Sequence, residues 1–326
     1  MKKKLFIKIY NGYGHTHNLH VYGHVFKKAP VEQKRFSTHV FTNMLYLLRL
    51  FFVKPVPGVH LSLQEQDQQI DGKTESDGFF AFEWDSSHHI KAGWHPVEVS
   101  TTFNEKEKVT GSGKVFIPHI TQYGFISDID DTIMVSHSST IWKRLTELFT
   151  KNARTRNIFD NVALHYNLLA KAHTDANSPN PFFYVSSSEW NLYNYLSDFF
   201  THHQLPEGIF LLSQVKRWYQ LLKTGKTKHE GKLLRILRIL EAFPSQKFVL
   251  LGDNSQSDPD IYASLARHHP EKIVAIYIRN VNSYKEAGTK KLLAGLAEEL
   301  NNTISTCFFS ESEEAIQHSR KIGLIE

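Results

Sequence analysis

Cysteine is almost absent from this chain of 326 residues, which contains only Cys307. A single cysteine cannot form an intrachain disulfide, so other interactions must hold the fold together. The first residues, MKKKLFIKIYNGYG, have a basic end but neither a sustained apolar core nor a small-residue cleavage site. These absences lead us to expect a protein of the reducing cytoplasm.

Long hydrophobic runs are absent as well. The most apolar stretch, MLYLLRLFFV at residues 44–53, is too short to span a bilayer and contains Arg49. We expect a buried element there or, as the alternative, one that lies at a membrane interface. Internal repeats and low-complexity segments are also lacking. With 41% hydrophobic and 22% charged residues, the chain has an ordinary globular composition and is long enough for two domains.

Positive charge is present but unevenly distributed. The formal net charge is +5, and within residues 213–240 the acid Glu230 stands against eight basic residues. Such a local field attracts anions, so nucleic acid, anionic lipid headgroups and phosphorylated small molecules are all candidate partners. The alternative is a solvated basic helix face. The basic residues are Lys216, Arg217, Lys223, Lys226, Lys228, Lys232, Arg235 and Arg238.

The pattern of apolar residues changes near residue 120. Before it, short strand-like runs such as LHVYGHVF, VHLSLQEQ and GFFAFEW predict a small β-sandwich domain over residues 1–120. After it, strand-like runs alternate with helical patterns, which predicts an α/β domain over residues 121–326 with helices around a parallel sheet. The predicted strands are YGFIS, PFFYVS, GIFLLS, KFVLLG, KIVAIYI and TISTCFF, and the clearest predicted helix is KLLRILRILEAF.

Histidines recur in GHTHNLHVYGH, at His15, His17, His20 and His24. Their spacing fits one face of a strand, and no acid or cysteine completes a metal site with them. We therefore expect surface histidines there.

The stretch FISDIDDTIMVS, residues 125–136, places Asp128, Asp130 and Asp131 directly after an apolar run. Crowded carboxylates repel one another, and burial raises their pKa, so a fold tolerates them only with compensation. A bound cation is the simplest compensation, and Mg²⁺ prefers such hard oxygen ligands. The alternative is a solvated loop with an aspartate helix cap.

Further polar residues end other predicted strands. Ser186 follows FFYV, Asp253 follows FVLLG, and Lys232 opens the helix that leads into the latter strand. Ligands of an open parallel sheet gather at the carboxyl ends of its strands, so we expect these side chains to meet Asp128. Together they suit phosphoryl transfer.

Each residue has a predicted role in that chemistry. Asp128 would attack phosphorus and carry an aspartyl-phosphate intermediate. Asp130 would protonate the leaving oxygen and later deprotonate the attacking water. Thr132 would orient this neighbourhood, while Ser186 and Lys232 would hold the phosphate oxygens.

The predicted Mg²⁺ ligands are the carboxylates of Asp128 and Asp253 and the backbone carbonyl of Asp130. Asp258 would support either the metal or Lys232, although DPDIY also reads as an aspartate N-cap followed by proline.

Three more residues compete for the phosphate. Ser187 and Ser188 adjoin Ser186, and Lys228 precedes Lys232. The serines could instead be plain turn residues, and Lys228 part of a basic face.

The order DIDDT, a strand ending in serine, a lysine and GDNSQSD resembles the haloacid dehalogenase-like phosphatases. The longer pieces SDIDDTI, FFYVSSSEWNLY and FVLLGDNSQSDPDIY are similar to the App1-type phosphatidate phosphatase family in particular. The similarity runs from about residue 10, where GYG and PVPGV resemble the family's amino-terminal β-domain, to YIRNV near residue 280. The resemblance implies a Rossmann-like catalytic domain with a minimal cap.

For function, the resemblance implies Mg²⁺-dependent removal of phosphate from phosphatidate to give diacylglycerol. Asp128 would be the nucleophile and Asp130 the acid and base. Two places depart from the family pattern: Glu189 stands where proline is usual, and Asn254-Ser255 replaces the usual Ser-Gly. The family roles also carry over to Ser186, Lys232, Asp253 and Asp258.

The substrate is expected to approach an open site. Residues 133–181 predict helices and leave no room for a large lid, which suits a headgroup embedded in a membrane or part of a polymer. The basic stretch 216–238, with Trp218 and Tyr219 interleaved, could rest on the inner face of an anionic membrane. The alternative is that Trp218 faces the core.

Two rival functions remain from the sequence. One is a non-catalytic module that binds lipid or carbohydrate surfaces through the β-sandwich, although such a module has no need of DIDDT and GDNSQSD together. The other is a phosphatase acting on a phosphoprotein or a nucleic-acid end, which the basic stretch permits.

Overall fold

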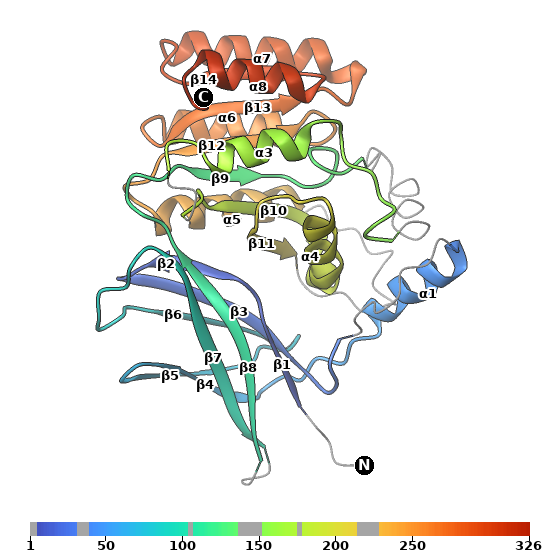
Figure 1. Cartoon of the computed structure of the whole chain (residues 1–326), viewed down its shortest axis with the longest axis vertical. Helices are drawn as coiled ribbons and strands as arrows, with labels where there is room; N and C mark the ends of the chain where they lie inside the picture. Colours follow the sequence, from blue (N-terminus) through green and yellow to red (C-terminus); the bar gives the residue numbers. More distant parts are fainter. Residues whose placement is uncertain (1–4, 31–38, 104–106, 136–151, 175–177, 214–227) are drawn as a thin grey trace. The chain divides into compact units, whose positions relative to one another are not determined.

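The computed structural model describes residues 5–30, 39–103, 107–135, 152–174, 178–213 and 228–326 (Figure 1). The chain divides into two compact units. The first comprises residues 1–34, 48–119 and 214–223, and the second comprises residues 35–47, 120–213 and 224–326.

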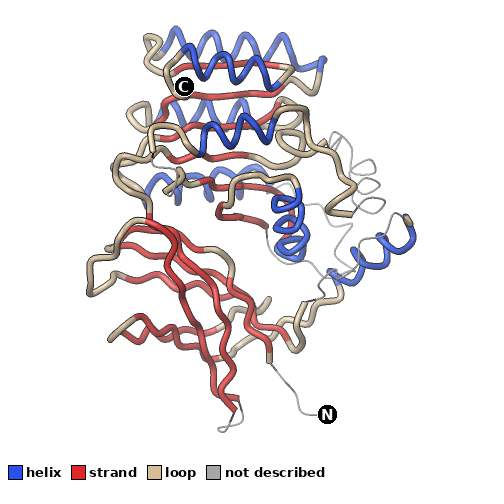
Figure 2. Tube along the Cα trace, viewed as in Figure 1, coloured by secondary structure: helices blue, strands red, loops and turns tan. Residues whose placement is uncertain are grey.

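Strands are the main regular elements in the described part of the first unit (Figure 2). Eight strands form one hydrogen-bonded sheet in the order β1-β3-β2-β8-β7-β4-β5, with β6 paired to β3. All described pairs are antiparallel except β2 with β8. The β-rich character predicted for residues 1–120 is thus confirmed as a mainly antiparallel sheet, whereas the predicted sandwich arrangement stays a prediction. Its strands are β1 (Phe6–Ile9), β2 (Gly12–His15), β3 (Asn18–Phe26), β4 (His60–Glu65), β5 (Gln68–Lys73), β6 (Phe79–Trp84), β7 (Gly93–Phe103) and β8 (Glu107–Ile117).

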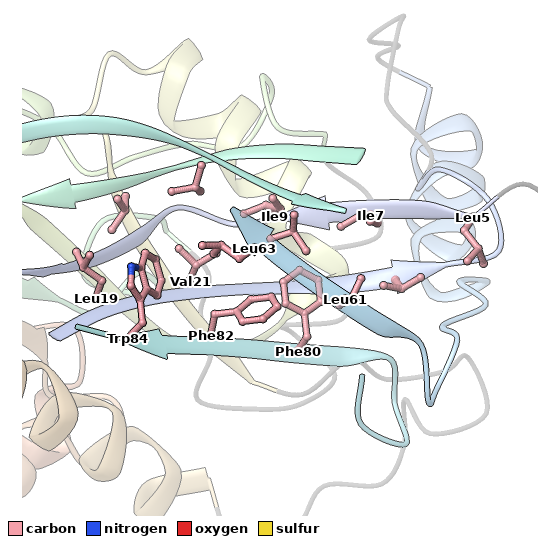
Figure 3. Close-up of a cluster of buried hydrophobic side chains, with 14 of the residues drawn as sticks. Leu5, Ile7, Ile9, Leu19, Val21, Leu61, Leu63, Phe80, Phe82 and Trp84 are labelled. Carbon is pink, nitrogen blue, oxygen red and sulfur yellow. The ribbon is translucent and has the colours of Figure 1, made fainter. Parts of the chain in front are cut away.

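Alternation along these strands builds the core of the first unit. In β4, Leu61 and Leu63 are buried, and in β6 so are Phe80, Phe82 and Trp84, as expected for a strand with one face toward the core. Figure 3 shows these side chains gathered with others from β1 and β3.

The histidine prediction is wrong for His24, which is completely buried in β3. Its Nδ1 pairs with the Tyr10 hydroxyl at 3.0 Å, and burial lowers the pKa of the imidazole to about 3. The ring also stacks on Phe26, so a polar residue serves as part of an aromatic cluster. Among the described residues, no histidine belongs to a group spaced to hold a metal.

The apolar stretch 44–53 lies largely in helix α1 (Val40–Phe51). This helix buries Leu47 and Leu50 but exposes Phe41 and Leu45. Across the described residues, every helix is too short or too polar to cross a bilayer.

The second unit contains a parallel sheet of six strands among its described residues, in the order β11-β10-β9-β12-β13-β14. Nearly every residue of β9, β10 and β12 is buried, as expected when helices cover both faces. All six predicted strands are confirmed. They are β9 (Gly124–Ser127), β10 (Phe182–Glu189), β11 (Gly208–Ser213), β12 (Phe248–Asp253), β13 (Ile273–Arg279) and β14 (Ser305–Phe309).

Helices pack on both faces of this sheet, with α3 beside α8 and α6 beside α7 (Figure 2). The amphipathic helix predicted in KLLRILRILEAF is part of α5. The helices are α3 (Val162–Ala170), α4 (Tyr193–His202), α5 (Lys228–Ala242), α6 (Asp258–His268), α7 (Glu286–Glu299) and α8 (Ser312–Lys321), with short turns η1 (Trp190–Leu192) and η3 (Ser283–Lys285).

Counted from β9, the strand order is 3-2-1-4-5-6, so the winding direction reverses between β9 and β12. A reversal of this kind opens a crevice beyond the carboxyl ends of the two central strands. Asp128 follows β9 and Asp253 ends β12, so both acids stand where the winding direction reverses.

Candidate active site

Asp128 and Asp253 are brought together by the register of β9 and β12. Ser127 pairs with Leu251, and the amide of Asp128 donates to the Leu251 carbonyl at 2.9 Å. Both acids are buried, with side chains at the same edge of the sheet. The prediction that strand-terminal acids meet is therefore confirmed for this pair.

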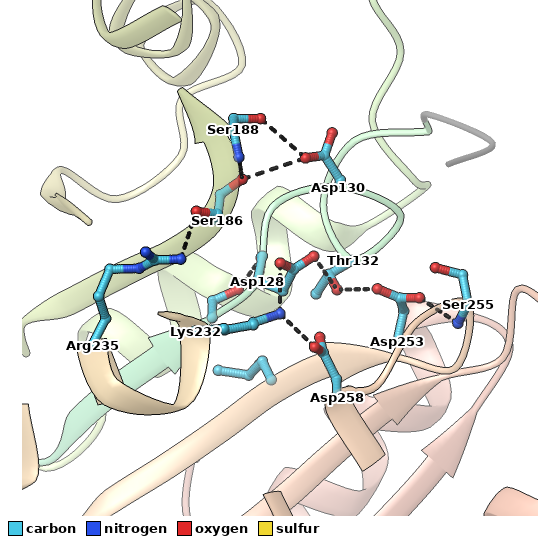
Figure 4. A network of polar contacts seen from close by, with 12 residues as sticks. Asp128, Asp130, Thr132, Ser186, Ser188, Lys232, Arg235, Asp253, Ser255 and Asp258 are labelled. Atoms are coloured by element: carbon cyan, nitrogen blue, oxygen red, sulfur yellow. Dashed lines mark hydrogen bonds and ion pairs between the residues drawn. The ribbon is translucent and has the colours of Figure 1, made fainter. Parts of the chain in front are cut away.

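Lys232 reaches Asp128 and Asp258 from α5 (Figure 4). Its Nζ donates to Oδ1 of Asp128 at 2.8 Å and also to Oδ1 of Asp258. Burial alone would lower the pKa of this ammonium, but the charges of Asp128 and Asp258 outweigh burial and hold the pKa above its ordinary value. Lys232 is therefore a permanent cation between two carboxylates.

Three carboxylates form a candidate metal centre. Asp128, Asp253 and Asp258 each offer one oxygen, and these oxygens lie within 4.8 Å of one another. Burial raises the pKa of Asp128 well above its ordinary value and that of Asp253 to about 7. Three carboxylates against one ammonium leave two formal negative charges, so the cluster lacks positive charge. A divalent cation matches that deficit.

Asp258 supports this fit. Its Oδ2 is buried and has no hydrogen-bond partner among the described residues, which suits an atom that would coordinate a metal ion. The helix α6 begins at Asp258, and Ser257 occupies the N-cap position. The carboxylate of Asp258 points to Lys232, so the simple capping alternative does not describe it.

A glycine makes room for Asp258. A Cβ at Gly252 would lie 2.5 Å from Oδ2 of Asp258 and 2.8 Å from the Tyr262 ring. Only a residue without a side chain lets α6 approach the end of β12 this closely.

Thr132 stands between two of the acids. Its hydroxyl lies 3.4 Å from Oδ2 of Asp128 and 3.2 Å from Oδ2 of Asp253. A hydroxyl has one proton to donate, so it serves one carboxylate at a time. Thr132 therefore stands beside both acids, and its orienting role stays a prediction.

Asp130 faces a different set of partners (Figure 4). Its Oδ2 accepts from the hydroxyls of Ser186 at 3.4 Å and Ser188 at 3.2 Å. On the other side, Nη2 of Arg156 lies 3.7 Å from Oδ1. The Asp130 carboxylate stands outside the metal cluster, and the predicted contact through its backbone carbonyl stays a prediction.

The third acid of DIDDT turns the chain. Asp131 has φ +61°, a left-handed conformation that aspartate tolerates, and its amide donates to the Met134 carbonyl at 2.8 Å. Crowded in sequence, Asp128, Asp130 and Asp131 thus separate into three environments.

The serines of β10 differ from one another. Ser186 and Ser188 are buried, and the Ser188 amide donates to Oγ of Ser186 at 3.0 Å, whereas Ser187 is half-buried. Both buried hydroxyls contact Asp130, and whether one also holds phosphate stays a prediction. Glu189, the departure from the family pattern, is buried at the end of β10.

The basic stretch is only partly visible. Residues 214–227 and the side chain of Lys228 lie outside the described part, and Trp218 and Tyr219 with them. Arg235 is no solvated cation, because it donates to the Ser186 carbonyl at 3.3 Å and burial lowers the pKa of its guanidinium to about 10. It holds β10 beside the site.

Sequence reasoning missed Arg279, which is buried at the end of β13 next to Asp253. It donates to the Thr132 carbonyl at 3.1 Å, to the Ser310 carbonyl at 3.1 Å and to the Ser312 hydroxyl at 2.8 Å. The DIDDT loop is thereby tied to the loop after β14. The signal was the arginine that ends an otherwise apolar strand.

Asn254 was noted only as a departure from the family pattern. Its Oδ1 accepts from the amides of Val281 and Asn282, and its Nδ2 donates to Oδ1 of Asn280. The side chain thus binds the loop after β12 to the loop after β13, next to the metal cluster.

Comparison with known proteins agrees with this site. Residues 123–280 match the family described as phosphatidate phosphatase APP1, catalytic domain. Phosphatidate phosphatase APP1 of Saccharomyces cerevisiae is 33% identical over 159 residues, which cover 48% of this chain and 25% of that protein. An uncharacterised protein of Schizosaccharomyces pombe is 30% identical over 186 residues, covering 55% and 29%. The chain thus matches between a quarter and a third of the length of these relatives.

A solved carbohydrate acetylesterase from Xanthomonas citri also aligns, with 9% identity over 96% of this chain and 72% of that one, but its TM-score of 0.32 is too low to inform the fold. The matched segment contains the entire acid and lysine cluster. Residues 123–280 belong to the App1-type phosphatidate phosphatase catalytic-domain family.

Proposed function

We propose that this protein is a Mg²⁺-dependent phosphomonoesterase that hydrolyses phosphatidate to diacylglycerol and inorganic phosphate. The observation that carries the proposal is the buried cluster of Asp128, Lys232, Asp253 and Asp258 inside the matched segment. It combines a nucleophile, a fixed cation and a carboxylate set suited to a divalent metal.

The proposal includes the fold family. A parallel sheet ordered 3-2-1-4-5-6, with the nucleophile after its first strand and a second acid after its fourth, is what a haloacid dehalogenase-like Rossmann domain requires. The division into residues 1–120 and a catalytic domain from residue 121 is part of the same proposal.

The first half of the reaction forms an acyl phosphate. A carboxylate oxygen of Asp128 attacks phosphorus in line, and the bond from phosphorus to the glycerol oxygen breaks. Asp130 gives its proton to that departing oxygen, and Lys232 stabilises the negative charge on the phosphoryl oxygens.

The second half regenerates the enzyme. Asp130 takes a proton from water, which attacks the phosphorus of the aspartyl phosphate, and the bond to Asp128 breaks to release inorganic phosphate. Asp130 is left protonated for the next turnover. Bound Mg²⁺ would be held by Asp128, Asp253 and Asp258 and would neutralise charge on the phosphoryl group.

Ionisation of Asp128 supports the metal requirement. Burial and the nearby acids raise the pKa of Asp128, and a protonated carboxyl group is a poor nucleophile. A divalent cation beside the same oxygens favours the ionised form.

Contact with a membrane surface is proposed from the substrate class. Its expected carriers, the basic residues 216–226, lie outside the described residues, as does the helix expected from STIWKRLTELF at residues 139–149. The cytoplasmic location and the position at the inner membrane face stay predictions.

The test compares three substrate classes with purified protein: phosphatidate in vesicles, phosphopeptides and phosphorylated oligonucleotides, each with Mg²⁺ and with EDTA. We expect phosphate release from phosphatidate only with Mg²⁺. Preference for a peptide or an oligonucleotide would replace the substrate but keep the enzyme class. Binding to vesicles with no phosphate release from any substrate would favour the non-catalytic module.

The intermediate can be tested separately. Acid quenching during turnover of ³²P-labelled substrate should trap label on the protein, and hydroxylamine should release it. Asp128→Asn should trap none. Equal labelling of the variant would refute the assignment of the nucleophile.

A further inference from the structure

A small cavity of about 10 Å³ adjoins Asp130, and none of the three metal-cluster carboxylates lines it. It is lined by Asp130, Arg156 and Ser188 and by the apolar side chains of Leu192 and Leu196. Such a volume has room for about one water and none for a substrate group. The polar atoms around it therefore serve Asp130 and not a second ligand.

Arg156 is the unusual member of this set. Its side chain is almost fully buried, with 3% of the residue exposed. Nη2 lies 3.7 Å from Oδ1 of Asp130, and neither Nε nor Nη2 has a hydrogen-bond partner in the described part of the chain. A buried guanidinium with unmet donors is unfavourable, so a filling role alone would be served better by an apolar residue.

The backbone holds Arg156 firmly in this place. Its amide donates to the Asn152 carbonyl at 3.2 Å, and its carbonyl accepts from Nε2 of His203 at 3.0 Å. The next residues are tied to the chain just after DIDDT, because Val135 donates to Asn157 and Phe159 donates to Ile133. Backbone hydrogen bonds therefore join the segment that contains Arg156 to the segment that contains Asp130.

The contacts of Asp130 divide between its two oxygens. Ser186 and Ser188 donate to Oδ2, while Arg156 faces Oδ1. Contacts on both oxygens restrain rotation of the carboxyl group about its terminal bond. A general acid has to present its proton along one direction, so this restraint bears on proton transfer.

We infer that Arg156 is a positioning residue for proton transfer by Asp130, acting with Ser188. The inference rests on the proposed phosphatase function. In turnover, Arg156 touches neither the phosphate nor the metal ligands, and its effect is confined to the step in which the leaving oxygen takes the proton of Asp130.

The leaving group reveals such a role. When an alkyl phosphate such as phosphatidate is cleaved, its alcohol leaves as a strongly basic alkoxide unless the leaving oxygen is protonated. The 4-nitrophenolate of an aryl phosphate is weakly basic and leaves without a proton. Impaired positioning of the acid should therefore slow the alkyl substrate far more than the aryl substrate. A general loss of structure would slow both alike.

The experiment measures kcat and KM of the full chain for phosphatidate in mixed micelles, a soluble alkyl phosphate and 4-nitrophenyl phosphate. We expect Arg156→Gln to lower kcat for both alkyl substrates about 10²-fold and for the aryl substrate less than about 10-fold. KM should stay within about threefold, because no substrate contact is lost. Arg156→Lys, which keeps the charge but not the planar fork, should fall between parent and Arg156→Gln.

Two further variants guard against a folding defect. Ser188→Ala removes the neighbouring contact to Asp130 and should show the same selective loss, less than additive with Arg156→Gln. Arg154→Gln, at an exposed position of the same segment, should match the parent on all three substrates.

The outcomes distinguish a failure of the positioning role of Arg156 from a failure of the proposed phosphatase function. Equal loss on alkyl and aryl substrates in Arg156→Lys and Ser188→Ala, or no loss on the alkyl substrates, would overturn the positioning role while leaving the phosphatase intact. A parent that hydrolyses none of the three substrates would overturn the proposed function and this inference with it.

Discussion

Replacing Asp253 by asparagine should stabilise the metal-free protein at neutral pH while removing its response to Mg²⁺. Burial raises the pKa of Asp253 to about 7, whereas an aspartate in the unfolded chain titrates near 4. Between these values the folded state holds a proton that the unfolded state has lost. The free energy of unfolding therefore falls as the pH rises through this window, and it is flat above the folded value.

The magnitude follows from the separation of the two pKa values. About three pH units at 1.36 kcal/mol each correspond to about 4 kcal/mol, of which about 3 kcal/mol falls between pH 5 and pH 8. Asparagine has no proton to lose there, so it removes this dependence. A cation bound to Asp128, Asp253 and Asp258 offsets the same cost in the parent, because it stabilises the ionised carboxylates.

Urea unfolding at about pH 5 and pH 8, with EDTA and then with saturating Mg²⁺, measures the pH dependence of stability and the stabilisation by Mg²⁺. Both are measured in the unfolding transition whose midpoint changes with Mg²⁺. At 100 times its dissociation constant, Mg²⁺ should add about 2.7 kcal/mol to the parent and far less to Asp253→Asn. Asp260→Asn, at an exposed position of α6, is the matched control and should respond to Mg²⁺ like the parent. An equal loss of stability in parent and Asp253→Asn between the two pH values would refute the reasoning.

Three other substitutions test single contacts. Asp128→Asn should lower phosphatidate turnover more than about 10³-fold without lowering the urea midpoint, and activity above a few per cent of the parent would contradict the covalent mechanism. Gly252→Ala, whose Cβ would lie 2.5 Å from Oδ2 of Asp258, should cost about 1–3 kcal/mol and weaken Mg²⁺ binding in a fluorescence titration. Gly295→Ala on α7, with no atom within 4 Å of its Cβ, is its control and should be neutral or stabilising by up to about 1 kcal/mol. Arg279→Met leaves the Thr132 carbonyl without its donor and should reduce kcat and stability together, by about 2 kcal/mol or more in stability; loss of neither would show that the DIDDT loop does not need this anchor.

The acids of the site could be predicted because they follow buried strands. An acid that directly follows a short strand-like run is expected at the end of that strand, and parallel strands bring all such ends to one edge of the sheet. Asp128 and Asp253 needed no further information. The sequence could not show that Asp258 turns toward Lys232, because Asp-Pro at a helix start is explained equally well by capping.

Residues that act through a distant partner left weaker signals or none. Arg156 lies 26 positions from Asp130 in a segment without a strong period, and its role depends on pairing between residues 133–135 and 157–159. Ser188 differs from Ser187 only in which way the strand turns it, and β10 is irregular between Val185 and Glu189. Strand alternation therefore could not assign these serines in advance.

The choice among the basic residues shows where helix periodicity stops being informative. Lys232 and Arg235 stand three positions apart, so the 3.6-residue period places both on one face of α5. Their function depends on which strand each helical turn lies beside, and the helical period gives no information about that. In the fold, Lys232 meets Asp128 and Asp258, while Arg235, nearly one turn later, meets the carbonyl of Ser186 on β10. Basic residues on one helix face thus contact two different strands, Lys232 the acid after β9 and Arg235 a carbonyl within β10. The sequence could therefore identify the face that serves the site, and only tertiary packing could identify the lysine.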